Sequence, residues 1–256
     1  MLRTLTIALV TLALGSCESR PTASTATPSA SARAAAPLRP AGLLAVERVT
    51  GGARAEERLP LVVALHGLGD DAASFMGLFD GLGARARVVV LQAPTPHGAG
   101  FSWFPFRPDA DDAARARALT EPAARVARAI GELAAQRPTL GKPLVTGFSQ
   151  GGMLSFTIAA RHPEAIGMAI PVGGLLPPPL FPRTEVADAP RVQALHGAKD
   201  SLVPEADGYR AIGALAQKGY DARFDSFGDV GHQIPPAMRA ALHGHIAAYV
   251  AGAGGP

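Results

Sequence analysis

Short apolar runs alternate with segments of helical periodicity along most of the chain, and this alternation constrains the fold more than any other feature. The runs at 59–65, 87–93 and 143–146 are rich in Val and Leu and show no polar alternation. Strands buried on both faces of a sheet have such sequences. Segments with apolar residues at helical spacing, such as 111–137, lie between them. We therefore predict an α/β fold with a mostly parallel central sheet and helices on both faces.

The remaining boundaries follow from the same patterns. Residues 43–49 alternate as an edge strand does. Pro122 is expected to break or restart the helix of 111–137, because proline lacks the amide that a helix needs. Asp70 or Asp71 is expected to cap a helix that ends near Gly81. Further strands are predicted at 165–172, 191–195 and 221–227, and further helices at 150–161, 205–218 and 236–250.

The amino terminus differs in character from the rest of the chain. Residues 1–16 carry Arg3 followed by an apolar stretch over 5–14, which is typical of a secretory signal and too short to span a bilayer. Residues 14–17 read LGSC and resemble the lipobox of bacterial lipoproteins, in which the cysteine receives a diacylglycerol. This resemblance implies lipidation of Cys17, the one cysteine of the chain. The alternative is an ordinary secretory leader that ends near a cysteine.

The expected domain limits follow from this. Residues 17–41 combine the lipidated cysteine with a segment rich in Ser, Thr, Ala and Pro, which buries too little apolar surface to fold and is expected to be a flexible tether. Residues 42–250 are the expected α/β domain, and 251–256 a disordered tail. We expect an exported protein anchored to a membrane of the cell envelope. Glu18 favours the outer membrane, by analogy with the sorting of such lipoproteins.

A short motif with a candidate catalytic residue lies between a predicted strand and a predicted helix. Residues 147–151 read GFSQG, directly after a predicted strand and at the start of a predicted helix. In the G-x-S-x-G pattern the serine occupies a strained strand-to-helix turn, and only small residues fit two positions before and after it. The turn exposes the hydroxyl of Ser149 above the sheet, which makes this serine the predicted nucleophile. The alternative is a glycine-rich helix start with a passive serine.

The loop after an earlier strand supplies a second element. Residues 66–71 read HGLGDD and follow the apolar run at 59–65. Next to a G-x-S-x-G turn, this loop provides one amide of the oxyanion hole, and the residue after the nucleophile provides the other. This assigns the backbone amides of Leu68 and Gln150 to the oxyanion. His66 precedes the nucleophile in the chain, and we expect it to hydrogen-bond within its loop rather than to act in catalysis.

The candidates for the catalytic acid and base follow two further predicted strands. Asp200 follows the strand predicted at 191–195, where an ionised carboxylate can accept the imidazole N–H and fix its tautomer. His232 lies between the last predicted strand and the last predicted helix, and it follows Asp200 in the chain. It is therefore the candidate for the base that removes the serine proton. Ser149, Asp200 and His232 thus follow the order nucleophile, acid, base. The alternatives are a solvated or helix-capping Asp200 and a surface-loop His232.

At this point a family resemblance is visible. In chain order, the segments HGLGDD, GFSQGG and HGAKDSLVP and the Gly-His pair before the last helix resemble those of the phospholipase/carboxylesterase family, over roughly 42–250. The resemblance implies the α/β-hydrolase fold and the triad and oxyanion amides assigned above. This family includes acyl-protein thioesterases and bacterial carboxylesterases. The chain departs from it around 105–112, and it carries an export signal whereas the acyl-protein enzymes are mostly cytosolic.

The loop of 94–109 is rich in aromatic residues. Phe101, Trp103 and Phe104 resemble the family's Trp-Phe pair beside the acyl pocket, and Phe106 follows them. Aromatic side chains bury large areas and line pockets for acyl or aryl groups. We therefore expect Phe101, Trp103 and Phe104 to bind substrate. The alternative is that they only pack the loop onto the sheet.

Composition excludes several functions. The net charge is +3, and no stripe of Lys or Arg is interleaved with aromatic residues, so nucleic-acid binding is not expected. A single cysteine excludes an intrachain disulfide and a zinc site built on thiolates. No metal-binding pattern is present in the sequence, and we expect neither a metal nor a cofactor. The expected partners are a small-molecule ester and the membrane; the sequence leaves the oligomeric state undefined.

Together these features predict a serine hydrolase that cleaves carboxylic or thioesters of small or acyl substrates through an acyl-enzyme intermediate. An exported esterase for phenolic (feruloyl) esters or a polyester depolymerase is an alternative that fits the export signal. An alternative of another class is an inactive, membrane-tethered binding protein on a hydrolase scaffold. The presence of Ser149, Asp200 and His232 in the required order argues against that last one.

Overall fold

The central sheet of the domain is mostly parallel. The structure, a computed structural model, describes residues 38–105, 107 and 109–253. Seven strands lie in the order β1-β3-β2-β6-β7-β8-β9. All neighbours pair in parallel except β1 with β3, which are antiparallel. The position of β1 at the edge of the sheet confirms the predicted edge strand. The strands are β1 (Ala45–Val49), β2 (Leu61–Leu65), β3 (Arg87–Leu91), β6 (Leu144–Phe148), β7 (Met168–Val172), β8 (Arg191–Gly197) and β9 (Ala222–Phe227), and a separate hairpin joins β4 (Thr95–His97) to β5 (Gly100–Ser102).

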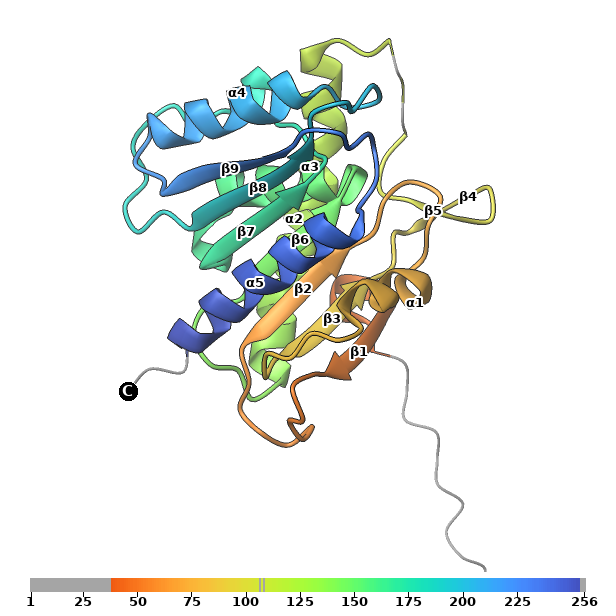
Figure 1. The fold of residues 1–256 in the computed structure, drawn as a ribbon, viewed down its shortest axis with the longest axis vertical. Helices are drawn as coiled ribbons and strands as arrows, with labels where there is room; N and C mark the ends of the chain where they lie inside the picture. The colour runs from red at the N-terminus through yellow and green to blue at the C-terminus, as the bar shows by residue number, and fades with distance from the viewer. Residues whose placement is uncertain (1–37, 106, 108, 254–256) are drawn as a thin grey trace, which may run out of the picture. The chain divides into compact units, whose positions relative to one another are not determined.

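Helices cover both faces of the sheet (Figure 1). On one face lie α2 (Asp112–Gln136), α3 (Gln150–Arg161) and α4 (Glu205–Ala216), and on the other α1 (Ala72–Phe75) and α5 (Pro236–Ala253). Short 3₁₀ turns occupy Pro40–Gly42, Met76–Phe79, Pro163–Ala165 and Pro178–Leu180. This arrangement confirms the predicted α/β fold.

The central strands have no polar alternation because both of their faces are buried. Along β2, Leu61, Val63 and Leu65 belong to the core beneath α2 and α3, whereas Val62 and Ala64 belong to the core beneath α1 and α5. All five side chains are at most 1% exposed. The side chains of successive residues thus point into the cores on opposite faces of the sheet, as the two-residue period of a strand requires.

Two predicted helix boundaries are wrong. Pro122 lies inside α2, which continues through it to Gln136. The apolar face around the proline, including Leu119 and Val126, is fully buried, and this packing outweighs a proline cost of roughly 3 kcal/mol. The helix expected to end near Gly81 is a single α-helical turn followed by a 3₁₀ turn, although Asp71 caps it as predicted.

The folded domain extends beyond its expected limits at both ends. The carbonyl of Leu38 accepts a hydrogen bond from the Ala45 amide (3.0 Å), and Pro40 is buried, so the last residues of the expected tether pack on the domain. At the other end α5 runs to Ala253, into the expected tail. The signal segment 1–16, Cys17 and the final three residues lie outside the described part, so export and anchoring stay predictions. Within the described residues, no helix combines the length and apolarity that crossing a membrane requires.

Candidate active site

The candidate residues meet at the carboxyl edge of the sheet, where its topology changes direction. The chain leaves β2 through α1 on one face and leaves β6 through α3 on the other, while β2 and β6 are hydrogen-bonded neighbours. In open α/β sheets such a switch point opens a crevice above the strand ends. The loop containing Leu68 follows β2, and Ser149 follows β6 directly.

Ser149 occupies a strained turn between β6 and α3. Its backbone angles are φ 55° and ψ −114°, which a residue with a Cβ rarely adopts. The neighbouring glycines make this turn sterically feasible. An added Cβ at Gly151 would overlap the Leu65 carbonyl oxygen, and one at Gly147 would overlap the backbone of Gly151. The G-x-S-x-G spacing therefore reflects the close approach of α3 to β2 and β6.

Three side chains from separate loops form one hydrogen-bonded line. His232 Nε2 lies 2.9 Å from Ser149 Oγ, and His232 Nδ1 lies 2.7 Å from Asp200 Oδ2. An ionised carboxylate only accepts hydrogen bonds, so Nδ1 carries the ring proton. Nε2 is then the acceptor for the serine hydroxyl. The structure thus brings together Ser149, Asp200 and His232 in the orientation that proton removal from the serine needs.

The carboxylate of Asp200 is buried and held from two sides. Its side chain is 1% exposed. Oδ1 accepts hydrogen bonds from the amides of Leu202 (3.0 Å) and Val203 (2.8 Å), which leaves Oδ2 facing His232. The buried His196 lies behind it, with Nε2 3.5 Å from Oδ2 and 2.9 Å from the Val203 carbonyl oxygen. Sequence reasoning missed His196; its only signal was a position at the end of a predicted strand.

The two backbone amides assigned to an oxyanion both lie at this crevice. Leu68 stands in a loop that is tied to β5 by a hydrogen bond from the Gly69 amide to the Phe101 carbonyl (2.9 Å). Gln150 is the first residue of α3, where helix amides have no intrahelical acceptor. Among the described residues, neither amide donates a hydrogen bond to another group of the protein.

His66 is a buried residue at the start of the loop that contains Leu68. Its ring is fully buried, its Nδ1 donates to the Gly67 carbonyl (2.7 Å), and its Nε2 accepts from the Ala93 amide (3.1 Å). Burial lowers the pKa of His66 below its ordinary value of 6.5, despite the carboxylates of Asp70 and Asp71 nearby. The neutral ring therefore carries one donor and one acceptor, and both are used.

This burial makes the stability of the protein sensitive to acid. As the pH falls through the ordinary pKa of 6.5, the imidazole of residue 66 takes up a proton more readily in the unfolded chain than in the folded one, so the free energy of unfolding should fall as the pH is lowered from about 7.5 to 5.5. His66 contributes at most about 1.4 kcal/mol per pH unit. His66→Gln should show a flatter profile in urea denaturation at several pH values. His162, whose pKa is also lowered by burial, remains in both proteins. Parallel profiles would contradict the assignment.

The aromatic residues at 101–104 differ in their contacts, and Trp103 is the most deeply buried of them. Trp103 is 3% exposed, and its indole N–H donates to the His66 carbonyl (2.9 Å). Its backbone N–H donates to Gln150 Oε1 (2.9 Å), and Gln150 Nε2 donates to the Phe104 carbonyl (2.9 Å). Trp103 and the Gln150 side chain therefore connect the two segments that carry the amides predicted to bind the oxyanion.

Phe101, Trp103 and Phe104 were all expected to bind substrate, and that role stays a prediction, but the structure places the three side chains differently. Of the three, Phe104 lines the cavity that is described in the next paragraph, and Phe101 and Trp103 do not. Phe101 packs partly buried against the core. Trp103 lies within the core, where its indole N–H donates to the His66 carbonyl. Phe106 lies outside the described residues.

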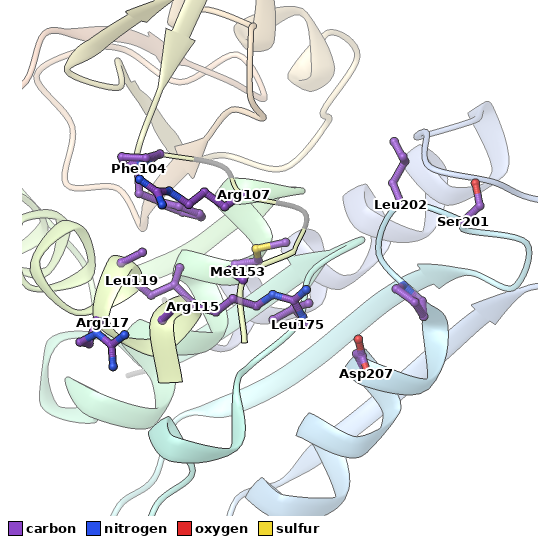
Figure 2. Close-up of a pocket in the computed structure, with 15 residues that line it drawn as sticks. Phe104, Arg107, Arg115, Arg117, Leu119, Met153, Leu175, Ser201, Leu202 and Asp207 are labelled. Carbon is purple, nitrogen blue, oxygen red and sulfur yellow. The ribbon is translucent and has the colours of Figure 1, made fainter. Parts of the chain in front are cut away.

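A cavity of about 720 Å³ is lined by residues close in sequence to the triad (Figure 2), although Ser149, Asp200 and His232 are not among its lining residues. It includes Met153, one helical turn beyond Ser149, with the Met153 amide bound to the Ser149 carbonyl (2.9 Å). It also includes Ser201 and Leu202, which directly follow Asp200. Its size is that of a site for a small organic ligand. Within the described residues, no group of three or more His, Cys, Asp or Glu side chains is arranged to hold a metal ion.

The order of the triad along the chain, its position above a mostly parallel sheet and the strained serine turn define the class, an α/β hydrolase. The sequence model of the phospholipase/carboxylesterase family matches residues 47–250, so the chain belongs to this family. It is by this membership a carboxylic ester hydrolase, as the motifs predicted. No curated protein matches the chain significantly.

Several solved structures share the fold. Esterase PE8 superposes with a TM-score of 0.70 at 24% identity, covering 81% of this chain and 99% of that one. Acyl-protein thioesterase 2 of Zea mays gives 0.62 at 23% identity, covering 80% and 99%. The Bacillus cereus carboxylesterase gives 0.66 at 16% identity, covering 79% and 92%. At these identities the likeness extends to the fold and not to the substrate.

Proposed function

We propose that the protein hydrolyses carboxylic esters through a covalent intermediate on Ser149. The serine Oγ forms a bond to the carbonyl carbon of the ester while its proton passes to His232 Nε2. The negative charge then forming on the carbonyl oxygen is held by the amides of Leu68 and Gln150, the second of which also lies at the positive end of α3. Asp200 keeps the histidine in the required tautomer and stabilises its charged form.

The bond to the leaving alcohol then breaks, and His232 returns the proton to the alcohol oxygen, which leaves the acyl group on Ser149. In the second half of the reaction water loses a proton to His232 Nε2 and attacks the acyl carbon. The bond from that carbon to Oγ breaks, the proton passes from Nε2 to Oγ, and the acid is released. The observation that carries this proposal is the continuous contact from Ser149 Oγ through His232 to Asp200, at 2.9 Å and 2.7 Å.

Covalent labelling with a fluorophosphonate tests the proposal. We expect one adduct per chain, on the peptide that contains Ser149, with loss of p-nitrophenyl butyrate hydrolysis in proportion to labelling. His232→Ala should label far more slowly at the same concentration, because its serine lacks a base. Failure of the wild type to label while folded would instead support an inactive binding protein on this scaffold, and an adduct at another serine would exclude Ser149 as nucleophile.

The same chemistry accommodates thioesters, phenolic esters and polyesters. Initial rates on matched thioester, short-chain alkyl and feruloyl substrates would separate an acyl-thioesterase from an exported esterase for phenolic or polymeric esters. The amino-terminal motif adds the proposal that the enzyme is exported and held to a membrane through Cys17.

A further inference from the structure

The cavity of about 720 Å³ has an apolar interior. Leu119, Met153 and Leu175 line it and are at most 7% exposed, and Phe104 adds an aromatic wall. These residues come from α2, from α3, from the segment after β7 and from the loop after β5. Such a lining fits an alkyl or aryl group, because apolar surface of the ligand and of the cavity leaves water together.

Leu202 shows that this apolar lining continues to the mouth of the cavity. Its side chain is 69% exposed, although it belongs to the same cavity. It follows Asp200 by two residues, and Figure 2 shows it on the side opposite Phe104. An apolar group of a substrate that enters here would cover this leucine.

The charged residues of the cavity are almost all of one sign. Arg107, Arg115 and Arg117 line it, and Asp207 is the one carboxylate among the lining residues that are described. Asp207 is bound by Arg210, with 2.8 Å between Nη2 and Oδ1. The cavity therefore combines an apolar interior with an excess of guanidinium groups.

The positions of these groups are unequal. Arg115 is half-buried, and Figure 2 places it between the Phe104 side and the Asp207 side of the cavity. Arg107 and Arg117 are exposed. Guanidinium groups bind carboxylates and phosphates through paired N–H donors, and a partly desolvated site strengthens such contacts. The side chains of Arg107 and Arg117 are exposed, so they can contact an anion that enters the cavity without leaving a buried environment.

We propose that this cavity selects esters with an apolar chain or ring that ends in an anionic group, remote from the bond that is cleaved. The apolar part lies along Met153 and Leu175, and the anion is held by the two exposed arginines of the cavity, Arg107 and Arg117. This inference rests on the proposed hydrolase function and specifies the class of substrate.

Matched pairs of substrates test it. The p-nitrophenyl monoesters of adipate and suberate carry a free carboxylate at the end of the acyl chain, and p-nitrophenyl hexanoate and octanoate are neutral esters of the same length. We expect kcat/KM to favour the anionic member of each pair by about tenfold, the value of one charge-assisted hydrogen bond. Added salt of about 0.5 M should reduce this preference, because ions screen the exposed arginines.

Substitutions of single arginines show which residues cause the preference for anionic esters. Arg107→Gln, Arg117→Gln and the double variant should each lower the preference for the anionic ester while leaving kcat/KM for the neutral ester within about twofold. Arg54→Gln is a matched control, because Arg54 is an exposed arginine paired with Glu57 and does not line the cavity. It should behave as the wild type does with all four esters.

A second pair places the anion on the alcohol side: the acetate of 3-(4-hydroxyphenyl)propionate against the acetate of 4-propylphenol. An arginine-dependent preference in either series supports the proposal and tells which half of the ester enters the cavity. Equal rates within both series, or variants that slow charged and neutral esters alike, would overturn it. Hydrolysis of none of these esters would instead overturn the proposed function.

Discussion

Replacing Ser149 with alanine is expected to lower kcat for p-nitrophenyl butyrate by about 10⁶-fold, the loss seen when a serine protease loses its nucleophile. Without Oγ, His232 has no hydroxyl to deprotonate and no acyl-enzyme forms. The fold should survive, because alanine keeps the Cβ that the turn already accommodates at φ 55°. The oxyanion amides remain, so a residual rate above that of water is expected.

The measurement requires a control for contaminating esterase activity. Ser74→Ala, purified in the same way, changes an exposed serine of α1 outside the site and should keep the wild-type kcat. Thermal unfolding of Ser149→Ala should match that of the wild type within a few degrees. A kcat reduced by less than about 100-fold in a folded variant would mean that another group forms the covalent bond.

Much of the site could be predicted because its determinants are local in sequence. The spacing of Gly147, Ser149 and Gly151 follows from the contact of one turn with the adjacent strand, where any added Cβ overlaps backbone. Asp200 and His232 could be placed because parallel strands bring their carboxyl ends to one edge. Each candidate could therefore be identified from the predicted strand that precedes it and from its residue type.

The features that escaped prediction depend on contacts between distant segments. Trp103 was expected to face substrate, yet the acceptors of its two N–H groups are His66 and Gln150, which no local pattern connects to it. Pro122 was expected to break or restart the helix, and only the burial of its flanking residues reveals why the helix continues through it. The arginine-lined cavity likewise combines α2 with the loop after β5, and its charge is visible only in three dimensions.

Exchanging Asp200 for asparagine is expected to lower kcat by about 10⁴-fold without unfolding the protein, as the same change does in a serine protease. The hydrogen bonds of the loop fix how the new amide lies. The amides of Leu202 and Val203 both donate to Oδ1, so the asparagine oxygen must take that place and its NH₂ group must face His232.

That orientation reverses the tautomer of the histidine. Nδ1 would accept from the asparagine NH₂, Nε2 would carry the proton, and the ring would donate to Ser149 Oγ instead of accepting from it. We therefore expect Asp200→Asn to lose kcat with p-nitrophenyl butyrate while its thermal unfolding stays near that of the wild type, and to label slowly with a fluorophosphonate. Asp229→Asn, an exposed carboxylate three residues before His232, is the matched control and should keep full activity. A kcat within tenfold of the wild type would show that the His232 tautomer does not depend on the charge of residue 200.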